Sequence, residues 1–150
     1  MLGLIYYEGK YIQQNINKAL QYFSLASKQN NIIVLYNIGM IYYEGKYITK
    51  DIEKAIYCFS QISNKDYIDD ESILYDVNMT IENTNIKNDY STFSPNMIIP
   101  YAQYTLGIIY YKDIISVNKA IHYFSLAANH NIIFAYNYLA EIYYQGIYIE

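Results

Sequence analysis

Cysteine and histidine, which can bind a metal or take part in nucleophilic catalysis, occur at only three positions in this sequence. They are Cys58, His122 and His130. A structural zinc site needs about four ligands, whereas the two histidines stand eight residues apart with no cysteine near them. Cys58 fills a place that similar segments give to Tyr22 and Tyr123, so we expect a packed thiol rather than a nucleophile. The sequence therefore predicts no catalytic residue, no metal and no cofactor, and we expect the protein not to be an enzyme.

Two further patterns share letters with ligand-binding loops but lack their spacing. Four acidic residues fall within 66–71, but this run lacks the alternating ligands and the central glycine of an EF-hand loop. Gly-Lys occurs at 9–10 and at 45–46, but without the preceding glycine and the following Ser or Thr of a phosphate-binding loop. We expect a solvated acidic loop at 66–71 and no nucleotide site.

Tyrosine is the abundant residue that could contact another molecule. The chain of 150 residues has 22 tyrosines and is 53% hydrophobic, which is enough apolar surface to exclude intrinsic disorder. All ten basic residues are Lys, and 14 acidic residues give a net charge of −4. A protein that binds the phosphate backbone of nucleic acids needs a concentration of cations, and Arg is its best bidentate donor. Composition therefore disfavours a nucleic-acid partner.

The elements that must position these side chains come from an internal repeat. The segment Leu-Gly-Leu-Ile-Tyr-Tyr-Glu-Gly-Lys-Tyr-Ile begins at residue 2 and recurs with two changes from residue 38. Shorter copies begin at residues 106 and 139, and a decayed copy surrounds residue 78. We therefore divide the chain into units of approximately 1–30, 31–66, 67–97, 98–131 and 132–150. The first and last units are truncated, and the third is degenerate.

Each unit is predicted to form two α-helices. In the second halves of the units, apolar residues follow the i, i+3, i+4, i+7 spacing of one helix face. A residue that can cap a helix N-terminus precedes each stripe: Asn15, Asp51, Asn85 and Ser116. Residues that tolerate a left-handed backbone are expected to end the helices: Gly9, Gly45 and Gly146 for first helices, and Asn30 or Asn131 for second helices.

Small residues recur at one place inside the first helices, although Gly there costs about 1 kcal/mol relative to Ala. These anchors are Gly3, Gly39, Gly107 and, in the last unit, Ala140. We expect the second helix to approach each anchor closely, with Ala19, Ala55 and Ala120 as the matching small residues. No unit can bury its stripe alone, so the fold class is predicted to be all-α: an α-α superhelix, a solenoid of antiparallel helix pairs. The third unit lacks both small anchors, so packing should be loosest around Asn78, Asp89 and Pro95.

The quoted segments resemble the Sel1-like repeat family, a relative of the tetratricopeptide repeats. The resemblance is carried by Tyr42-Tyr43-Glu44-Gly45, Asp51-Ile-Glu-Lys54-Ala55 and Leu106-Gly107, and it covers nearly the whole chain. The sequence departs from the family pattern where Tyr11, Tyr47 and Tyr148 replace the second loop glycine, and the fourth unit loses that glycine and three loop residues. The resemblance implies a non-enzymatic scaffold or adaptor for protein–protein interaction, whose first helices line a concave surface.

By analogy with related repeats, that surface is formed by the residues three before the anchor and one and four after it. The next residue, five after the anchor, also belongs to it. The candidate peptide-binding residues are Tyr7, Tyr36, Met40, Tyr43, Glu44, Tyr75, Tyr104, Ile108, Tyr111 and Tyr144. Such a tyrosine-rich, mildly acidic groove would suit a peptide with apolar anchors and some Lys or Arg. Two alternatives stay open: an RNA-binding helical repeat protein, and a decayed accessory repeat protein with no binding role.

The ends of the chain bear on location and assembly. The first residues have no basic flank and reach Glu8 too early for a signal peptide. The longest uncharged stretch, residues 90–111, contains both prolines of the chain, which disfavours a transmembrane segment. We therefore expect a soluble, cytoplasmic protein with no membrane partner. Since the array starts inside one first helix and stops after another, both ends should expose apolar stripes, which favours self-association.

Overall fold

A computed structural model of the chain describes residues 2–9, 12–27, 31–46, 48–64 and 95–146. These residues form seven helices and no strand. The helices are α1 (Leu2–Glu8), α2 (Ile16–Ser27), α3 (Ile32–Glu44), α4 (Ile52–Ser63), α6 (Pro95–Lys112), α7 (Val117–Asn129) and α8 (Ile133–Tyr144). The predicted all-α helical repeat solenoid is confirmed.

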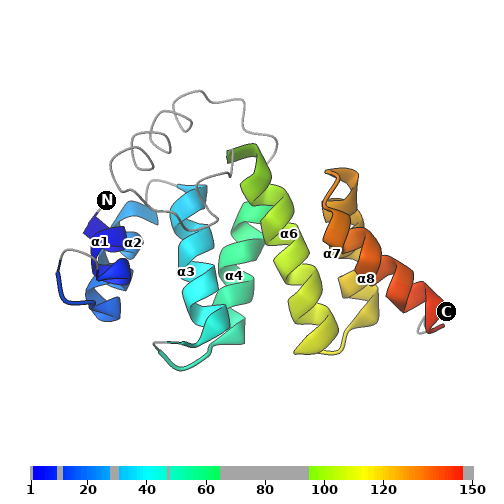
Figure 1. Ribbon diagram of the computed structural model, residues 1–150, viewed down its shortest axis with the longest axis horizontal. Coiled ribbons are helices and arrows are strands. Elements are labelled where there is room, and N and C mark those ends of the chain that lie inside the picture. Colours follow the sequence, from blue (N-terminus) through cyan, green and yellow to red (C-terminus); the bar gives the residue numbers. More distant parts are fainter. Residues whose placement is uncertain (1, 10–11, 28–30, 47, 65–94, 147–150) are drawn as a thin grey trace.

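The helices are stacked in chain order, as three hairpins followed by one helix (Figure 1). Within the hairpins, α1 packs against α2, α3 against α4 and α6 against α7; between them, α2 contacts α3, α4 contacts α6 and α7 contacts α8. The apolar stripes of α2, α4 and α7 are thereby covered by their neighbours. Phe59 of α4 and Phe124 of α7, which end the i to i+7 stripes of their helices, are fully buried.

Helix α4 of the second unit packs directly against α6 of the fourth unit. Ile62 of α4 and Ile98, Ile99 and Ala102 of α6 belong to one buried cluster. In the described part of the chain, the stack thus passes from the second unit to the fourth through a shared core. The predicted third unit, with Asn78, Asn85 and Asp89, lies outside the described residues apart from 95–97.

The helix ends agree with the sequence at most of the described positions. Gly9, Gly45 and Gly146 have φ angles of +66°, +62° and +65°, and Asn131 has +62°. In the shortened loop of the fourth unit, which has no glycine, Ile115 takes the left-handed conformation with φ +56°. This is a costly conformation for a β-branched residue. Asn30 lies outside the described residues.

Side-chain oxygens cap the N-termini of α2, α3 and α4, whereas the N-cap residues of α7 and α8 make no side-chain capping bond. Asn15 Oδ1 accepts a hydrogen bond from the Lys18 N–H, and Asp51 Oδ1 accepts one from the Lys54 N–H, both at 3.0 Å. Ser116 makes no side-chain capping bond. The sequence did not predict the cap of α3, where Asn31 Oδ1 accepts hydrogen bonds from two backbone N–H groups at 3.0 and 3.3 Å.

The anchor glycines face phenylalanine rings. A Cβ atom on Gly3, Gly39 or Gly107 would lie 2.7, 2.8 or 2.5 Å from the ring of Phe23, Phe59 or Phe124, respectively. The matching groups are therefore these rings and not Ala19, Ala55 and Ala120, although all three alanines are fully buried. Each alanine lies four residues before the phenylalanine, on the same helix face, and the longer side chain reaches the glycine. Ala140 of α8, in the equivalent place, is exposed.

None of the helices in the described ranges is long and apolar enough to cross a membrane.

Candidate functional site

Each described two-helix unit places a lysine over a tyrosine ring. The lysine belongs to the first turn of the second helix, and the tyrosine lies three residues after the anchor glycine. The Nζ atoms of Lys18, Lys54 and Lys119 lie 5.1, 5.0 and 5.0 Å from the ring centroids of Tyr6, Tyr42 and Tyr110. Such cation–π contacts stabilise the pairing of the two helices. These three lysines therefore contribute to the contact between the two helices of their unit.

In two units a second tyrosine stacks on the ring that the lysine covers. Tyr22 stacks on Tyr6 with 5.6 Å between ring centroids, and Tyr123 stacks on Tyr110 with 5.5 Å. In the second unit Cys58 takes this place and is buried. Burial raises the pKa of the Cys58 thiol to about 11, and the thiolate is the nucleophilic form. The structure thus agrees with the prediction of a packed thiol.

The other residues considered for metal binding do not come together. His122 and His130 are exposed. In the part of the chain that the structure describes, no three His, Cys, Asp or Glu side chains are grouped so that they could hold a metal ion. The acidic run at 66–71 lies outside that part.

Four tyrosines from three first helices lie close together. They are Tyr43 of α3, Tyr104 and Tyr111 of α6, and Tyr138 of α8; we call them the tyrosine cluster. The Tyr138 ring centroid lies 6.1 Å from that of Tyr104 and 5.7 Å from that of Tyr111. Tyr43 is near enough for Asp113 and Tyr138 to contribute to its raised pKa. Adjacent first helices therefore contribute to one aromatic surface.

The tyrosine cluster rests on the core through Phe124. The rings of Tyr138 and Phe124 are stacked, with 4.8 Å between centroids and an angle of 2° between planes. Tyr111 contacts the same ring edge-to-face at 6.5 Å, and Tyr104 lies 6.0 Å from it. Phe124 is fully buried, whereas the four tyrosines are half-buried. The rings are thus held in place from below while part of each side chain stays exposed.

Charges of both signs surround the tyrosine cluster. Lys50 Nζ donates to Asp113 Oδ1 at 2.8 Å and lies 4.9 Å from the Tyr43 ring centroid. Lys112 Nζ lies 5.3 Å from the Tyr138 ring centroid. On the other side, the Tyr111 hydroxyl donates a long hydrogen bond of 3.4 Å to a carboxylate oxygen of Glu141.

Burial raises the pKa of three hydroxyls in the tyrosine cluster. Burial is the largest cause for Tyr43, Tyr104 and Tyr111 alike, with a further contribution from Asp113 at Tyr43 and from Glu141 at Tyr111. All three hydroxyls are therefore neutral around pH 7. They can donate and accept hydrogen bonds beside apolar ring faces, which suits recognition and offers no general base.

The structure brings together only part of the predicted peptide-binding set. Tyr43, Tyr104 and Tyr111 share the tyrosine cluster. Tyr36, Met40 and Ile108 are half-buried against the same core, and Tyr7 packs against a separate core cluster formed by the first two units. Glu44 is exposed, Tyr144 is 93% exposed, and Tyr75 lies outside the described residues.

Tyr138 is the member of the tyrosine cluster that the sequence did not predict. It stands two residues before the anchor, where other units have Asn37 and Thr105. A large aromatic residue in place of a small polar one was the available signal.

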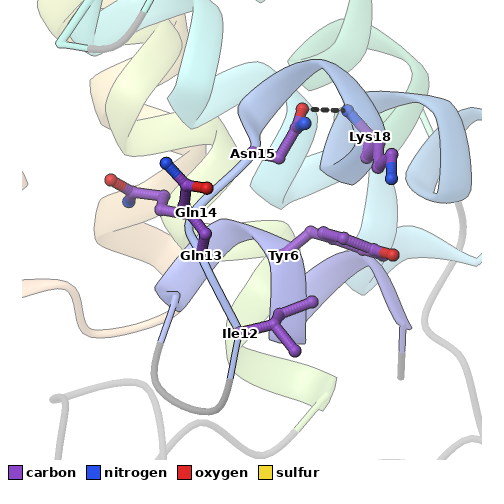
Figure 2. Close-up of a pocket in the computed structure, with 6 residues that line it drawn as sticks. All are labelled: Tyr6, Ile12, Gln13, Gln14, Asn15 and Lys18. Atoms are coloured by element: carbon purple, nitrogen blue, oxygen red, sulfur yellow. Dashed lines mark hydrogen bonds between the residues drawn. The ribbon is translucent and has the colours of Figure 1, made fainter.

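A shallow hollow lies at the N-terminal end of the array (Figure 2). Its volume is about 370 Å³, and it is lined by Tyr6, Ile12, Gln13, Gln14, Asn15 and Lys18. Gln14 Nε2 donates to the Tyr7 carbonyl at 2.7 Å, and Asn15 accepts the capping bond from Lys18. These polar groups stabilise the loop, so the tyrosine cluster is the better candidate site.

Comparison with known proteins identifies the repeat. The sequence matches the family model of the Sel1 repeat over residues 1–31, 33–67, 100–132 and 133–150. The structure is similar to the crystal structure of a Sel1 repeat protein from Oxalobacter formigenes, with 23% sequence identity and a TM-score of 0.40. That similarity covers 97% of this chain and 62% of the other, so this chain spans less than two thirds of its length. The comparison with curated proteins gives no match.

Proposed function

Because the chain belongs to the Sel1 repeat family, we propose that it is a non-enzymatic scaffold or adaptor that binds a protein or peptide on its first helices. Sel1 repeats generally mediate protein–protein interaction, and the tyrosine cluster is the surface that would do so here. This proposal includes Tyr43, Tyr104 and Tyr111 from the predicted set and adds Tyr138.

The observation that carries the proposal is the origin of the four rings on three different helices. No single unit supplies such a surface, so it exists only in the stacked array. Tyr provides a large contact area with few rotatable bonds, which keeps the entropic cost of binding low. Support of the tyrosine cluster by the buried ring of Phe124 lowers that cost further, since the rings are already ordered.

The charges favour a partner with an apolar or aromatic anchor and a nearby Lys or Arg. Asp113 and Lys50 form an ion pair, Lys112 lies over the Tyr138 ring and Glu141 accepts from the Tyr111 hydroxyl. Glu44 follows Tyr43 in the chain and is exposed, so the acids among these five residues outnumber the bases by one. At least five of the ten lysines of the chain already lie over tyrosine rings, which supports the capacity of these rings to accept an ammonium group.

Affinity capture with two matched tyrosine variants tests the proposal. The test variant carries Tyr43→Ala, which removes a half-buried ring of the tyrosine cluster. The control carries Tyr57→Ala, which removes a 64% exposed ring from a second helix, α4. Proteins captured by the unmodified chain are identified by mass spectrometry, and those lost with the test variant alone are candidate partners.

We expect the test variant to lose its partner while its far-ultraviolet circular dichroism stays that of the unmodified chain. Capture that is equal for the two variants would contradict binding on the first helices. Recovery of RNA in place of a specific protein would instead favour the RNA-binding alternative.

A further inference from the structure

One lysine of the chain lies against all four members of the tyrosine cluster. Lys112 is the last residue of α6 and is exposed, and its Nζ atom lies 5.3 Å from the Tyr138 ring centroid. Burial raises the pKa of Tyr43, Tyr104 and Tyr111, and the charge of Lys112 has a smaller, lowering effect on all three. The ammonium group is therefore near enough to act on every hydroxyl of the cluster.

The surroundings of Lys112 favour a positive charge. Neither ion pair of the described residues includes it. Its pKa is nevertheless raised, mainly by a hydrogen bond with the Tyr138 hydroxyl, so the cluster favours the ammonium form over the neutral amine. A negative charge is disfavoured, since burial raises the pKa of three of the four hydroxyls. The tyrosine cluster thus suits a cation better than an anion.

A lysine at this place is peculiar to the fourth unit. The residue five after the anchor is Glu8, Glu44 or Gln145 in the first, second and fifth units. The lysines that join the two helices of a unit come from second helices, whereas Lys112 comes from a first helix. Helix pairing in the repeat therefore does not depend on a lysine at this place.

We propose that Lys112 fills a binding site for an ammonium group, and that a lysine side chain of the partner takes its place in the tyrosine cluster. This inference rests on the proposed function, because the partner is the protein or peptide that the cluster binds. Lys112 can leave, since it is exposed at a helix end and has a flexible stem of four carbons. The exposed carboxylates of Glu44 and Glu141 favour the approach of a second cation.

Lys112 then acts as an internal competitor of the partner. A ligand binds only to the fraction of molecules whose site is open, so its apparent affinity falls in proportion to that fraction. Removal of the Lys112 ammonium should therefore strengthen the binding of a lysine side chain. An anion site would respond in the opposite direction, because Lys112 would then attract the ligand.

Nuclear magnetic resonance of the full chain, with ¹³C-labelled tyrosine, tests the proposal. The probe is Nα-acetyl-lysine methylamide, and its matched control is Nα-acetyl-norleucine methylamide, which has the same apolar stem without the ammonium group. The signals of the tyrosine cluster, assigned with single phenylalanine substitutions, are followed at constant ionic strength. We expect the lysine probe to shift these signals and to bind about threefold more tightly than the norleucine probe.

Variants of Lys112 test the competition. Lys112→Met keeps an apolar stem and removes the charge, so the affinity for the lysine probe should rise about threefold. Lys112→Glu introduces the residue of the first two units and should raise the affinity further. Lys119→Met removes the same charge from a lysine that lies over Tyr110 and should leave the affinity unchanged. Circular dichroism checks that each variant is folded.

Three results would overturn the proposal. They are no shift of the cluster signals by the lysine probe, equal binding of the two probes, and an affinity that Lys112→Met leaves unchanged or lowers. Tighter binding of Nα-acetyl-glutamate methylamide, lost in Lys112→Met, would mean that the cluster takes a carboxylate instead. Failure of the proposed function would be distinct, because partner capture would then be insensitive to Tyr43→Ala whatever the probes do.

Discussion

Gly107 allows the ring of Phe124 to come within 2.5 Å of the place where a Cβ atom would stand. The same ring is the base of the tyrosine cluster, because the Tyr138 ring stacks on it with 4.8 Å between the two centroids. A glycine in the middle of α6 therefore sets the position of the aromatic surface on α6 and α8. The cost of that glycine to the helix is about 1 kcal/mol, and the close packing offsets it.

Gly107→Ala should lower the free energy of unfolding although Ala favours the helix. Insertion of a methyl group into a packed core costs about 1–3 kcal/mol, and helix propensity returns about 1 kcal/mol, so we expect a net loss of up to about 2 kcal/mol by urea denaturation. Addition of Phe124→Leu should recover part of this loss. At the exposed Ala140 the preference reverses, and Ala140→Gly should cost about 1 kcal/mol. A stabilising Gly107→Ala would contradict the packing argument.

The case of Gly107 shows how far the sequence can predict this fold. Periodicity and recurring caps predicted the helix pairs, because they depend on the spacing of residues within one helix. Spacing also predicted a close approach at the glycines but assigned it to Ala120. Since Ala120 and Phe124 lie on one face, one turn apart, only the relative shift of two helices decides which residue meets Gly107, and that shift depends on packing.

The site was less predictable than the fold for the same reason. Tyr43 and Tyr111 were expected on the basis of the repeat, but Tyr138 departs from it and gains its place from contacts with Phe124. The ion pair of Lys50 and Asp113 joins residues 63 positions apart. It depends on direct stacking of the second and fourth units, which no local pattern of the sequence indicates.

Replacement of Ile115 should stabilise the protein. Ile115 has φ +56° and is 80% exposed, so it bears the strain of a left-handed backbone with little burial in return. That conformation costs about 1–2 kcal/mol for an L-residue with a Cβ atom, which glycine avoids. We expect Ile115→Gly to raise the free energy of unfolding by about 1 kcal/mol in thermal or urea denaturation. Ile114→Gly, the neighbouring exposed position, is the control and should not stabilise.

The Lys50–Asp113 ion pair should contribute little to stability and respond to salt. Its side chains are 44% and 22% exposed, and exposed pairs are worth about 0–1 kcal/mol. We therefore expect the coupling energy between Lys50→Gln and Asp113→Asn, from a double-mutant cycle, to fall below about 1 kcal/mol and to vanish in 1 M NaCl. A coupling that persists in high salt would show that the pair is more deeply buried than its exposure indicates.

The tyrosine cluster should make the protein sensitive to alkaline pH. The pKa values of Tyr43 and Tyr104 lie above the ordinary 10.0 in the folded chain, mainly because burial disfavours the phenolate. In the unfolded chain these hydroxyls lose their protons near pH 10, before the folded chain does, so the unfolded state binds fewer protons and stability falls with rising pH. The stability they contribute is complete below pH 10 and is lost as the pH rises through the folded pKa values. Urea denaturation between pH 8 and 11 should show this decline, and it should be shallower in the Tyr43→Phe, Tyr104→Phe variant. Tyr57→Phe, at a 64% exposed ring, should keep the full slope; equal slopes in all three proteins would contradict the assignment.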